Sequence, residues 1–123
     1  MSGIAGVYSF DGRPVGREVD RMVEAMEHRG PDGIQTWCDG SVGLGHCMLE
    51  TTPEDQYESL PGSDSSGSFF ITCDARIDNR SSLIGQLNVE KKDQTVTDSD
   101  IILESYKKWG TKCPNKIVGA FAF

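Results

Sequence analysis

The amino-acid sequence predicts a fold of the α+β class, with antiparallel strands and separate helices in one domain. Three observations lead to this prediction: short apolar runs typical of strands, charged stretches whose apolar residues recur at helical spacing, and an Asp39-Gly40 pair typical of a hairpin turn. A chain of 123 residues forms one domain at most and buries a modest core.

The first half of the chain predicts a strand, a helix and a hairpin. Residues 3–10 are expected to form a buried strand that ends at a turn. Residues 15–26 predict a helix, and the breaker at residues 30–33 follows it. Residues 34–38 and 41–49 predict the two strands of the hairpin. The apolar positions of the helix are Val15, Val19, Met22, Val23 and Met26.

The second half alternates polar loops with shorter elements. Residues 51–67 are polar and contain two prolines, which predicts a long mobile loop. Residues 68–73 predict a strand, and residues 81–87 predict a short helix that Asn79 or Ser81 could cap. A second polar loop is expected over residues 91–97, before a helix over residues 99–109.

The sequence ends on an apolar segment, residues 117–123, which predicts a last strand. A strand in this position has unpaired backbone groups and apolar side chains that no later segment covers. We therefore expect the chain to be the front part of a longer domain. Pairing of this strand with a second copy, as a homodimer, is an alternative way to cover it.

Composition and charge exclude several classes of protein. The net charge of −7 argues against a nucleic-acid partner, and no apolar run is long enough to cross a membrane. The N-terminus lacks the features of a secretory signal, which favours a cytoplasmic protein with reduced cysteines. No Cys-x-x-Cys pair is present, and the two histidines, His28 and His46, are far apart, so no metal site is predicted. Cys47 and Cys73 lie in apolar stretches and are expected to be buried.

Six short segments carry the strongest signal when they are taken together. In order they are SGIAG at 2–6, HRGPDG at 28–33, VGLGH at 42–46, TTPE at 51–54, DARIDNR at 74–80 and GAFAF at 119–123. In this order and spacing they resemble the N-terminal domain of asparagine synthetase-type proteins, the class II glutamine amidotransferases. The resemblance covers the whole chain.

The resemblance implies an N-terminal-nucleophile hydrolase-like fold, an αββα sandwich of two antiparallel sheets. It also implies that residues 1–123 are a partial glutamine amidotransferase type 2-like domain, incomplete at the C-terminus. A synthetase domain normally follows in the same chain. ATP and magnesium are expected only in that domain, and glutamine is the substrate that the resemblance suggests for this one.

Four family positions can be compared with this sequence. The family's catalytic cysteine corresponds to Ser2, which is either a weaker nucleophile or a plain strand-start serine. The Asn-Gly pair of the family's oxyanion hole corresponds to Asp74 and Ala75, and a turn or cap role is favoured for Asp74. The arginine that clamps the substrate carboxylate corresponds to Met48, a core-packing residue. Asp98 matches the residue that binds the α-amine, although its place before a helix explains it equally well.

Three hypotheses follow for the function. The favoured one is a degenerate domain, inactive in glutamine hydrolysis, because the nucleophile, the clamp and the oxyanion hole all differ from the family. The segment DARIDNR resembles members such as lasso-peptide cyclases and β-lactam synthetase, whose reactions need ATP and an internal amine but no ammonia. The alternatives are an active amidotransferase that uses Ser2 and supplies ammonia for asparagine synthesis, and a standalone interaction module.

Overall fold

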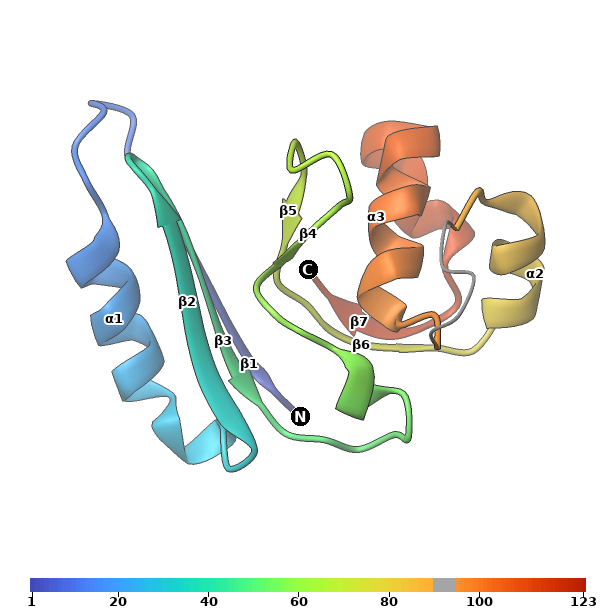
Figure 1. The fold of residues 1–123 in the computed structure, drawn as a ribbon, viewed down its shortest axis with the longest axis horizontal. Coiled ribbons are helices and arrows are strands. Elements are labelled where there is room, and N and C mark those ends of the chain that lie inside the picture. Colours follow the sequence, from blue (N-terminus) through green and yellow to red (C-terminus); the bar gives the residue numbers. More distant parts are fainter. Residues whose placement is uncertain (90–94) are drawn as a thin grey trace.

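The computed structural model describes residues 1–89 and 95–123 and arranges them in layers (Figure 1). From one side to the other, the view shows helix α1, a three-stranded sheet, the short strands of the second half, and helices α3 and α2. The strands and α-helices are β1 (Gly3–Tyr8), α1 (Gly16–Ala25), β2 (Gly33–Asp39), β3 (Val42–Met48), β4 (Gly62–Ser63), β5 (Phe70–Ile71), β6 (Asp74–Ile77), α2 (Arg80–Gln86), α3 (Asp98–Trp109) and β7 (Gly119–Ala122).

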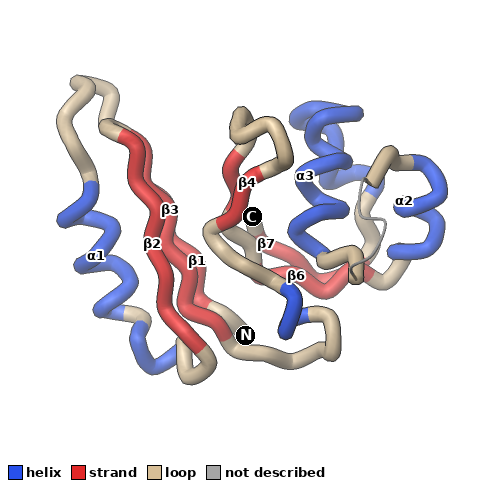
Figure 2. Tube along the Cα trace, in the orientation of Figure 1, coloured by secondary structure: helices blue, strands red, loops and turns tan. Residues whose placement is uncertain are grey.

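The first sheet is antiparallel, with the strand order β1-β3-β2. The predicted hairpin is confirmed: β2 and β3 pair from Asp39 and Val42 onward, and Gly40 takes a positive φ of 56° in the turn between them. Figure 2 shows this sheet running alongside α1. Because side chains alternate across a sheet, His46 and Met48 share the face of β3 that points away from α1.

Two glycines let α1 lie close to β3. A methyl group placed on Gly43 would overlap Val19, and one placed on Gly45 would overlap Val23. Both valines are buried, on the face of the helix that the apolar spacing predicted. The absence of side chains at these two positions therefore sets the distance between the helix and the sheet.

The second half has its own apolar core. Thr97 caps α3 in a capping box with Asp100, whose carboxylate accepts a hydrogen bond from the Thr97 N–H at 2.9 Å. Strands β6 and β7 pair in a two-stranded antiparallel sheet, and so do β4 and β5. The buried core side chains are Leu60, Ile71, Cys73, Ile77, Leu83, Leu87, Ile101, Ile102, Leu103 and Ile117.

Several details of the early elements differ from the sequence-based predictions. The first strand ends at Tyr8 and is buried on one face only, with Tyr8 62% exposed and Phe10 94% exposed. The predicted loop over residues 51–67 contains a 3₁₀ turn at Asp55–Tyr57 as well as strand β4. The predicted strand over residues 68–73 is shorter, because only β5 pairs there.

The later elements also bring corrections. Asp74 was predicted as a turn or cap residue, but it begins strand β6, because Ala122 of β7 pairs with it. Asn79 stands at the N-cap of α2, yet its side chain bonds the backbone of Lys116 and Val118 instead of the helix. Of the predicted loop over 91–97, residues 91–94 lie outside the described residues. Strand β7 pairs with β6 along one edge, and a dimer through this strand stays a prediction.

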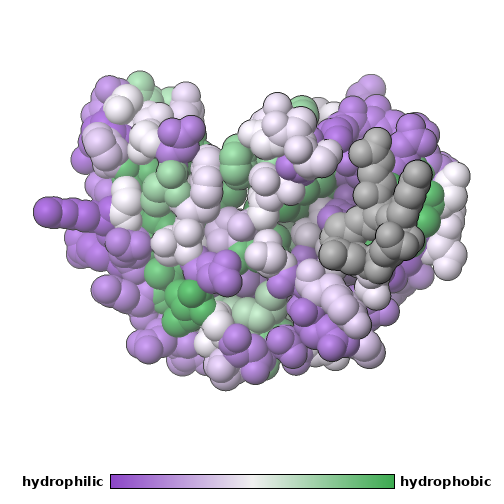
Figure 3. Space-filling view, viewed as in Figure 1, coloured by the Kyte–Doolittle hydropathy of each residue, from purple (hydrophilic) through white to green (hydrophobic). Residues whose placement is uncertain are grey.

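Burial and surface character agree with several expectations. Cys47 and Cys73 are buried as predicted, and burial raises the pKa of both thiols. No helix within residues 1–89 and 95–123 is long and apolar enough to cross a membrane. Figure 3 shows a mainly hydrophilic outer edge over α1, with apolar patches toward the middle of the view.

Candidate functional site

The five residues singled out from the sequence meet at one small cavity. Ser2, Met48, Asp74, Ala75 and Asp98 all line a space of about 20 Å³ between the first sheet and the layer formed by β6 and α3. The sequence separation between the first and last of these residues is 96 positions, so only the fold brings them together. The other lining residues are His46, Asp55, Glu58, Leu60 and Cys73.

The order and pairing of the strands explain why these five residues lie around one cavity. Gly3 pairs with Cys47, so Ser2 lies beside the end of β3. Asp74 and Ala75 begin β6, and Asp98 is the first residue of α3. The cavity therefore forms where one strand end, one strand start and one helix start come together.

Ser2 is held by its neighbours through its hydroxyl and its backbone N–H. Its Oγ accepts a hydrogen bond from the Leu49 N–H at 3.0 Å and donates to the Leu49 carbonyl oxygen at 3.4 Å. Its backbone N–H donates to Asp74 Oδ1 at 3.2 Å. With 9% of its surface exposed, Ser2 ties the start of β1 to the end of β3 and to β6.

The carboxylate of Asp98 already has partners within the protein. Its carboxylate forms an ion pair with Arg80 and accepts a hydrogen bond from the Ile77 N–H at 3.1 Å. Arg80 also donates to the Val96 carbonyl oxygen. These contacts join the start of α3 to β6 and α2, and the cap of this helix is Thr97, not Asp98.

Among residues 1–89 and 95–123, no arginine lines the cavity in place of Met48. Arg80 is paired with Asp98, and Arg76 forms an exposed ion pair with Asp78 at 3.1 Å. Neither arginine lines the cavity. A substrate carboxylate would therefore face a thioether and several carboxylates.

His46 is a site residue that the sequence reasoning missed. The Thr72 hydroxyl donates to the Gly45 carbonyl oxygen at 3.1 Å and lies 3.2 Å from His46 Nδ1. Burial lowers the pKa of His46, and the charges of Asp74 and Asp55 act against that shift. The strand alternation that places His46 on the same face as Met48 is the signal that could have found it.

Two further carboxylates in the cavity wall were also missed. Burial acts to raise the pKa of Asp55, but hydrogen bonds from Thr51 and Thr52, with N–O distances of 2.6 and 2.8 Å, outweigh it and lower the pKa. Burial raises the pKa of Glu58, although this carboxylate accepts hydrogen bonds from the N–H and the hydroxyl of Ser99. No sequence motif marks these two residues.

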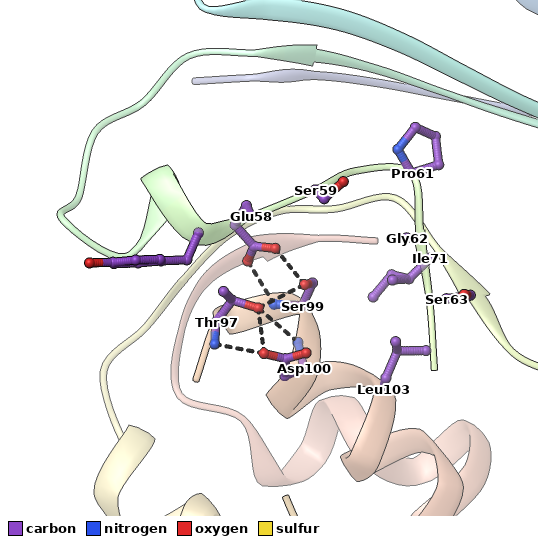
Figure 4. Close-up of a pocket in the computed structure, with 11 residues that line it drawn as sticks. Glu58, Ser59, Pro61, Gly62, Ser63, Ile71, Thr97, Ser99, Asp100 and Leu103 are labelled. Carbon is purple, nitrogen blue, oxygen red and sulfur yellow. Dashed lines mark hydrogen bonds between the residues drawn. The ribbon is translucent and has the colours of Figure 1, made fainter. Parts of the chain in front are cut away.

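Glu58 lines the small cavity and also a larger one. The larger cavity measures about 400 Å³ and opens at the start of α3 (Figure 4). In that view Glu58 points toward Ser99, and Thr97 bonds Asp100, so these polar groups partner one another. Within the described ranges, no three side chains of histidine, cysteine, aspartate or glutamate converge as a metal ion requires.

Comparisons with known proteins match the whole of this chain to one domain family. The profile of the family described as glutamine amidotransferase domain matches residues 1–123. A Methanocaldococcus jannaschii protein, provisionally named asparagine synthetase 2 (glutamine-hydrolyzing), is 28% identical over all of this chain and 27% of its own length. Asparagine synthetase 3 (glutamine-hydrolyzing) of Bacillus subtilis is 26% identical over all of this chain and 21% of its own length.

A third relative has a different name. Amidase chry2 of Gibberella zeae is 27% identical over 95% of this chain and 18% of its own length. The chain thus spans about a fifth to a quarter of the length of the curated relatives that it matches.

Proposed function

Because this chain belongs to the glutamine amidotransferase domain family, we propose that it is the N-terminal domain of an asparagine synthetase-like, amide-forming protein and that it does not hydrolyse glutamine. The observation that carries the proposal is the cavity of about 20 Å³ at Ser2. Ligand pockets commonly measure about 300–1,000 Å³, so the space beside Ser2 is much smaller than one that holds a glutamine side chain and its backbone.

The contacts of Ser2 support the same conclusion. An N-terminal nucleophile needs a free α-amine that acts as a base, and an amine acts as a base only when it is unprotonated. If Met1 is removed, the new amine lies where Ser2 N now lies, 3.2 Å from Asp74 Oδ1. A carboxylate at this distance favours the protonated, cationic form of the amine. Asp74 therefore opposes the activation that Ser2 would need.

Asp74 also opposes the second step of the chemistry. Acyl transfer requires donors at the point where the oxyanion develops, and an ionised carboxylate provides none. Loss of one such donor costs about 10²–10³ in rate, and a like charge in its place adds repulsion. The backbone N–H of Ala75 is the one part of the corresponding pair that could still donate.

The proposal also covers the fold of the complete domain and the other domain of the protein. We expect the complete domain to be an αββα sandwich, which the order of layers in Figure 1 supports: α1, the first sheet, the β6–β7 pair and α3. The long relatives support a synthetase domain in the same chain. We propose that ATP and magnesium bind in that domain. We also propose a cytoplasmic location.

Release of ammonia from glutamine tests the proposal directly. We expect the natural full-length protein and its Ser2→Ala variant to release ammonia at the same background rate. Ser2→Cys alone should stay close to that rate, because Asp74 and Met48 are unchanged. The combined change Ser2→Cys, Asp74→Asn and Met48→Arg restores nucleophile, donor and clamp, and should raise the rate above that of Ser2→Cys.

A thiol at a distant serine provides the control for this experiment. Ser66→Cys places a cysteine in an exposed turn and should release no ammonia. A wild-type rate well above background that Ser2→Ala abolishes would show that the domain is an active amidotransferase with Ser2 as its nucleophile, and the proposal would be wrong.

A further inference from the structure

Three cavities have one lining residue in common, Glu58. It lines the space of about 20 Å³ beside Ser2, a neighbouring space of about 100 Å³ and the large cavity of about 400 Å³. The two small spaces also share His46, Met48, Asp55 and Leu60. Among the residues that the structure describes, however, only Glu58 lines the large cavity together with either small one. Its side chain therefore lies where the large cavity comes closest to the space beside Ser2.

Hydrogen bonds from α3 hold the Glu58 side chain in this place. The Ser99 N–H donates to Glu58 Oε1 at 3.0 Å, and the Ser99 hydroxyl donates to Oε2. Ser99 is buried, and Figure 4 shows the Glu58 carboxylate directed at it. Two residues after Glu58, Leu60 is buried in the apolar cluster of the second half. Contacts on the side chain and on the neighbouring backbone therefore fix the position of Glu58.

We propose that Glu58 is a gatekeeper, whose side chain keeps a small molecule in the large cavity from reaching Ser2. The large cavity has the volume of a ligand pocket, and the space beside Ser2 does not. Glu58→Ala removes the carboxylate and the neighbouring methylene group, which joins the large cavity to the space beside Ser2. The inference rests on the proposed function, because it adds a steric barrier to the chemical obstacles at Ser2 and Asp74.

Cys73 provides a natural reporter for this barrier. It is buried and lines the space beside Ser2. The natural full-length protein is treated with iodoacetamide, and mass spectrometry of its peptides gives the alkylation rate of each cysteine separately. Because the reactivity of a thiol depends on its accessibility, we expect Glu58→Ala to speed the alkylation of Cys73 about tenfold or more.

Two other variants and two other cysteines are the controls. Glu58→Gln keeps the size of the side chain and an oxygen that can accept from the Ser99 N–H, so Cys73 should stay protected. Glu24→Ala makes the same truncation at an exposed position of α1, away from the three cavities, and should leave Cys73 protected as well. Cys47 and Cys113 are buried and line none of the three cavities, so they report on general unfolding. Their rates in Glu58→Ala should stay within about twofold of the wild type.

Three outcomes would overturn the proposal. If Cys73 reacts at the wild-type rate in Glu58→Ala, the side chain is not a barrier. If Glu58→Gln exposes Cys73 as much as Glu58→Ala does, the charge of Glu58 matters and its size does not. If Cys47 and Cys113 react faster to the same degree as Cys73, Glu58 only stabilises the fold. The experiment contains no glutamine, so its failure leaves the proposed function untouched, and ammonia release by the natural protein would overturn that function without changing the rate at Cys73.

Discussion

The two halves of the chain bury their helices in opposite ways. In the first half, α1 lies close to β3 because Gly43 and Gly45 have no side chains where Val19 and Val23 need space. In the second half, α3 contributes large aliphatic side chains, among them Ile101, to a continuous apolar cluster. Packing in the first half thus requires positions without side chains, and packing in the second half requires large side chains. Adding atoms should therefore destabilise the first half, and removing atoms should destabilise the second.

The boundary between the halves follows a third pattern. There several buried or half-buried groups are polar, and most of them have partners inside the protein: Ser2 with Leu49 and Asp74, Asp98 with Arg80, Glu58 with Ser99. Buried polar groups need such partners, because an unsatisfied one costs free energy. Substitutions at this boundary should therefore change pH dependence and binding more than packing.

Removing atoms from the aliphatic core should give the largest loss of stability. Ile101 is fully buried, and Ile101→Ala should lower the free energy of unfolding by about 2–5 kcal/mol, through lost burial and the cavity that remains. Urea unfolding measures the difference. Ile84→Ala, at a position 36% exposed on α2, is the control and should cost clearly less. Equal losses in the two variants would contradict the assignment of the core to α3.

Adding one methyl group to the first half should cost the next largest amount. Gly45→Ala places a methyl group against Val23, and overpacking of this kind costs about 1–3 kcal/mol. Gly85→Ala makes the same chemical change in α2, where nothing lies within 4 Å of the new atom. Because alanine favours helix, that control should be neutral or stabilising by up to about 1 kcal/mol. A stabilised Gly45→Ala protein would show that α1 can move away from the sheet at no cost.

The sequence predicts those elements whose signals are local. The helix at α1, the β2–β3 hairpin and the helix at α3 follow from apolar spacing and one turn pair, and the structure confirms them. Strand β6 could not be predicted, because Asp74, Ala75 and Arg76 have weak strand signals and pair with β7 more than 40 residues later. The 3₁₀ turn at Asp55–Tyr57 has no strong local signal either.

The candidate site shows the same division. Resemblance to a family identified the positions of Ser2, Met48, Asp74, Ala75 and Asp98, and the fold brings all five to one cavity. Their partners are a tertiary property, since Leu49 and Arg80 contact Ser2 and Asp98 across 47 and 18 positions of sequence. The place of Glu58 in the site is a tertiary property as well, because Glu58 contacts Ser99, which lies 41 positions later in the sequence.

Glu58 provides the smallest and most specific test, because it acts through pH. Burial raises the pKa of this carboxyl group above its ordinary value of 4.5, so the folded protein holds the proton more tightly than the unfolded chain does. The stabilisation from that proton is complete below pH 4.5 and is lost as the pH rises through the raised pKa. Near neutral pH, the charged carboxylate is therefore a net cost to the folded state.

Glu58→Gln removes this dependence and keeps the size of the side chain. Relative to the wild type, the variant should gain stability between pH 4 and pH 7.5, as measured by urea unfolding at the two pH values. Glu24→Gln makes the same change at an exposed position of α1 and should shift stability by less than about 0.5 kcal/mol at either pH. His46 works in the opposite direction, because its lowered pKa adds stability as the pH rises toward 6.5, so only the difference between Glu58→Gln and the wild type isolates Glu58. If the stability difference between Glu58→Gln and the wild type stays constant with pH, Glu58 is solvated in the folded protein. The boundary between the halves would then be more accessible to water than its hydrogen bonds indicate.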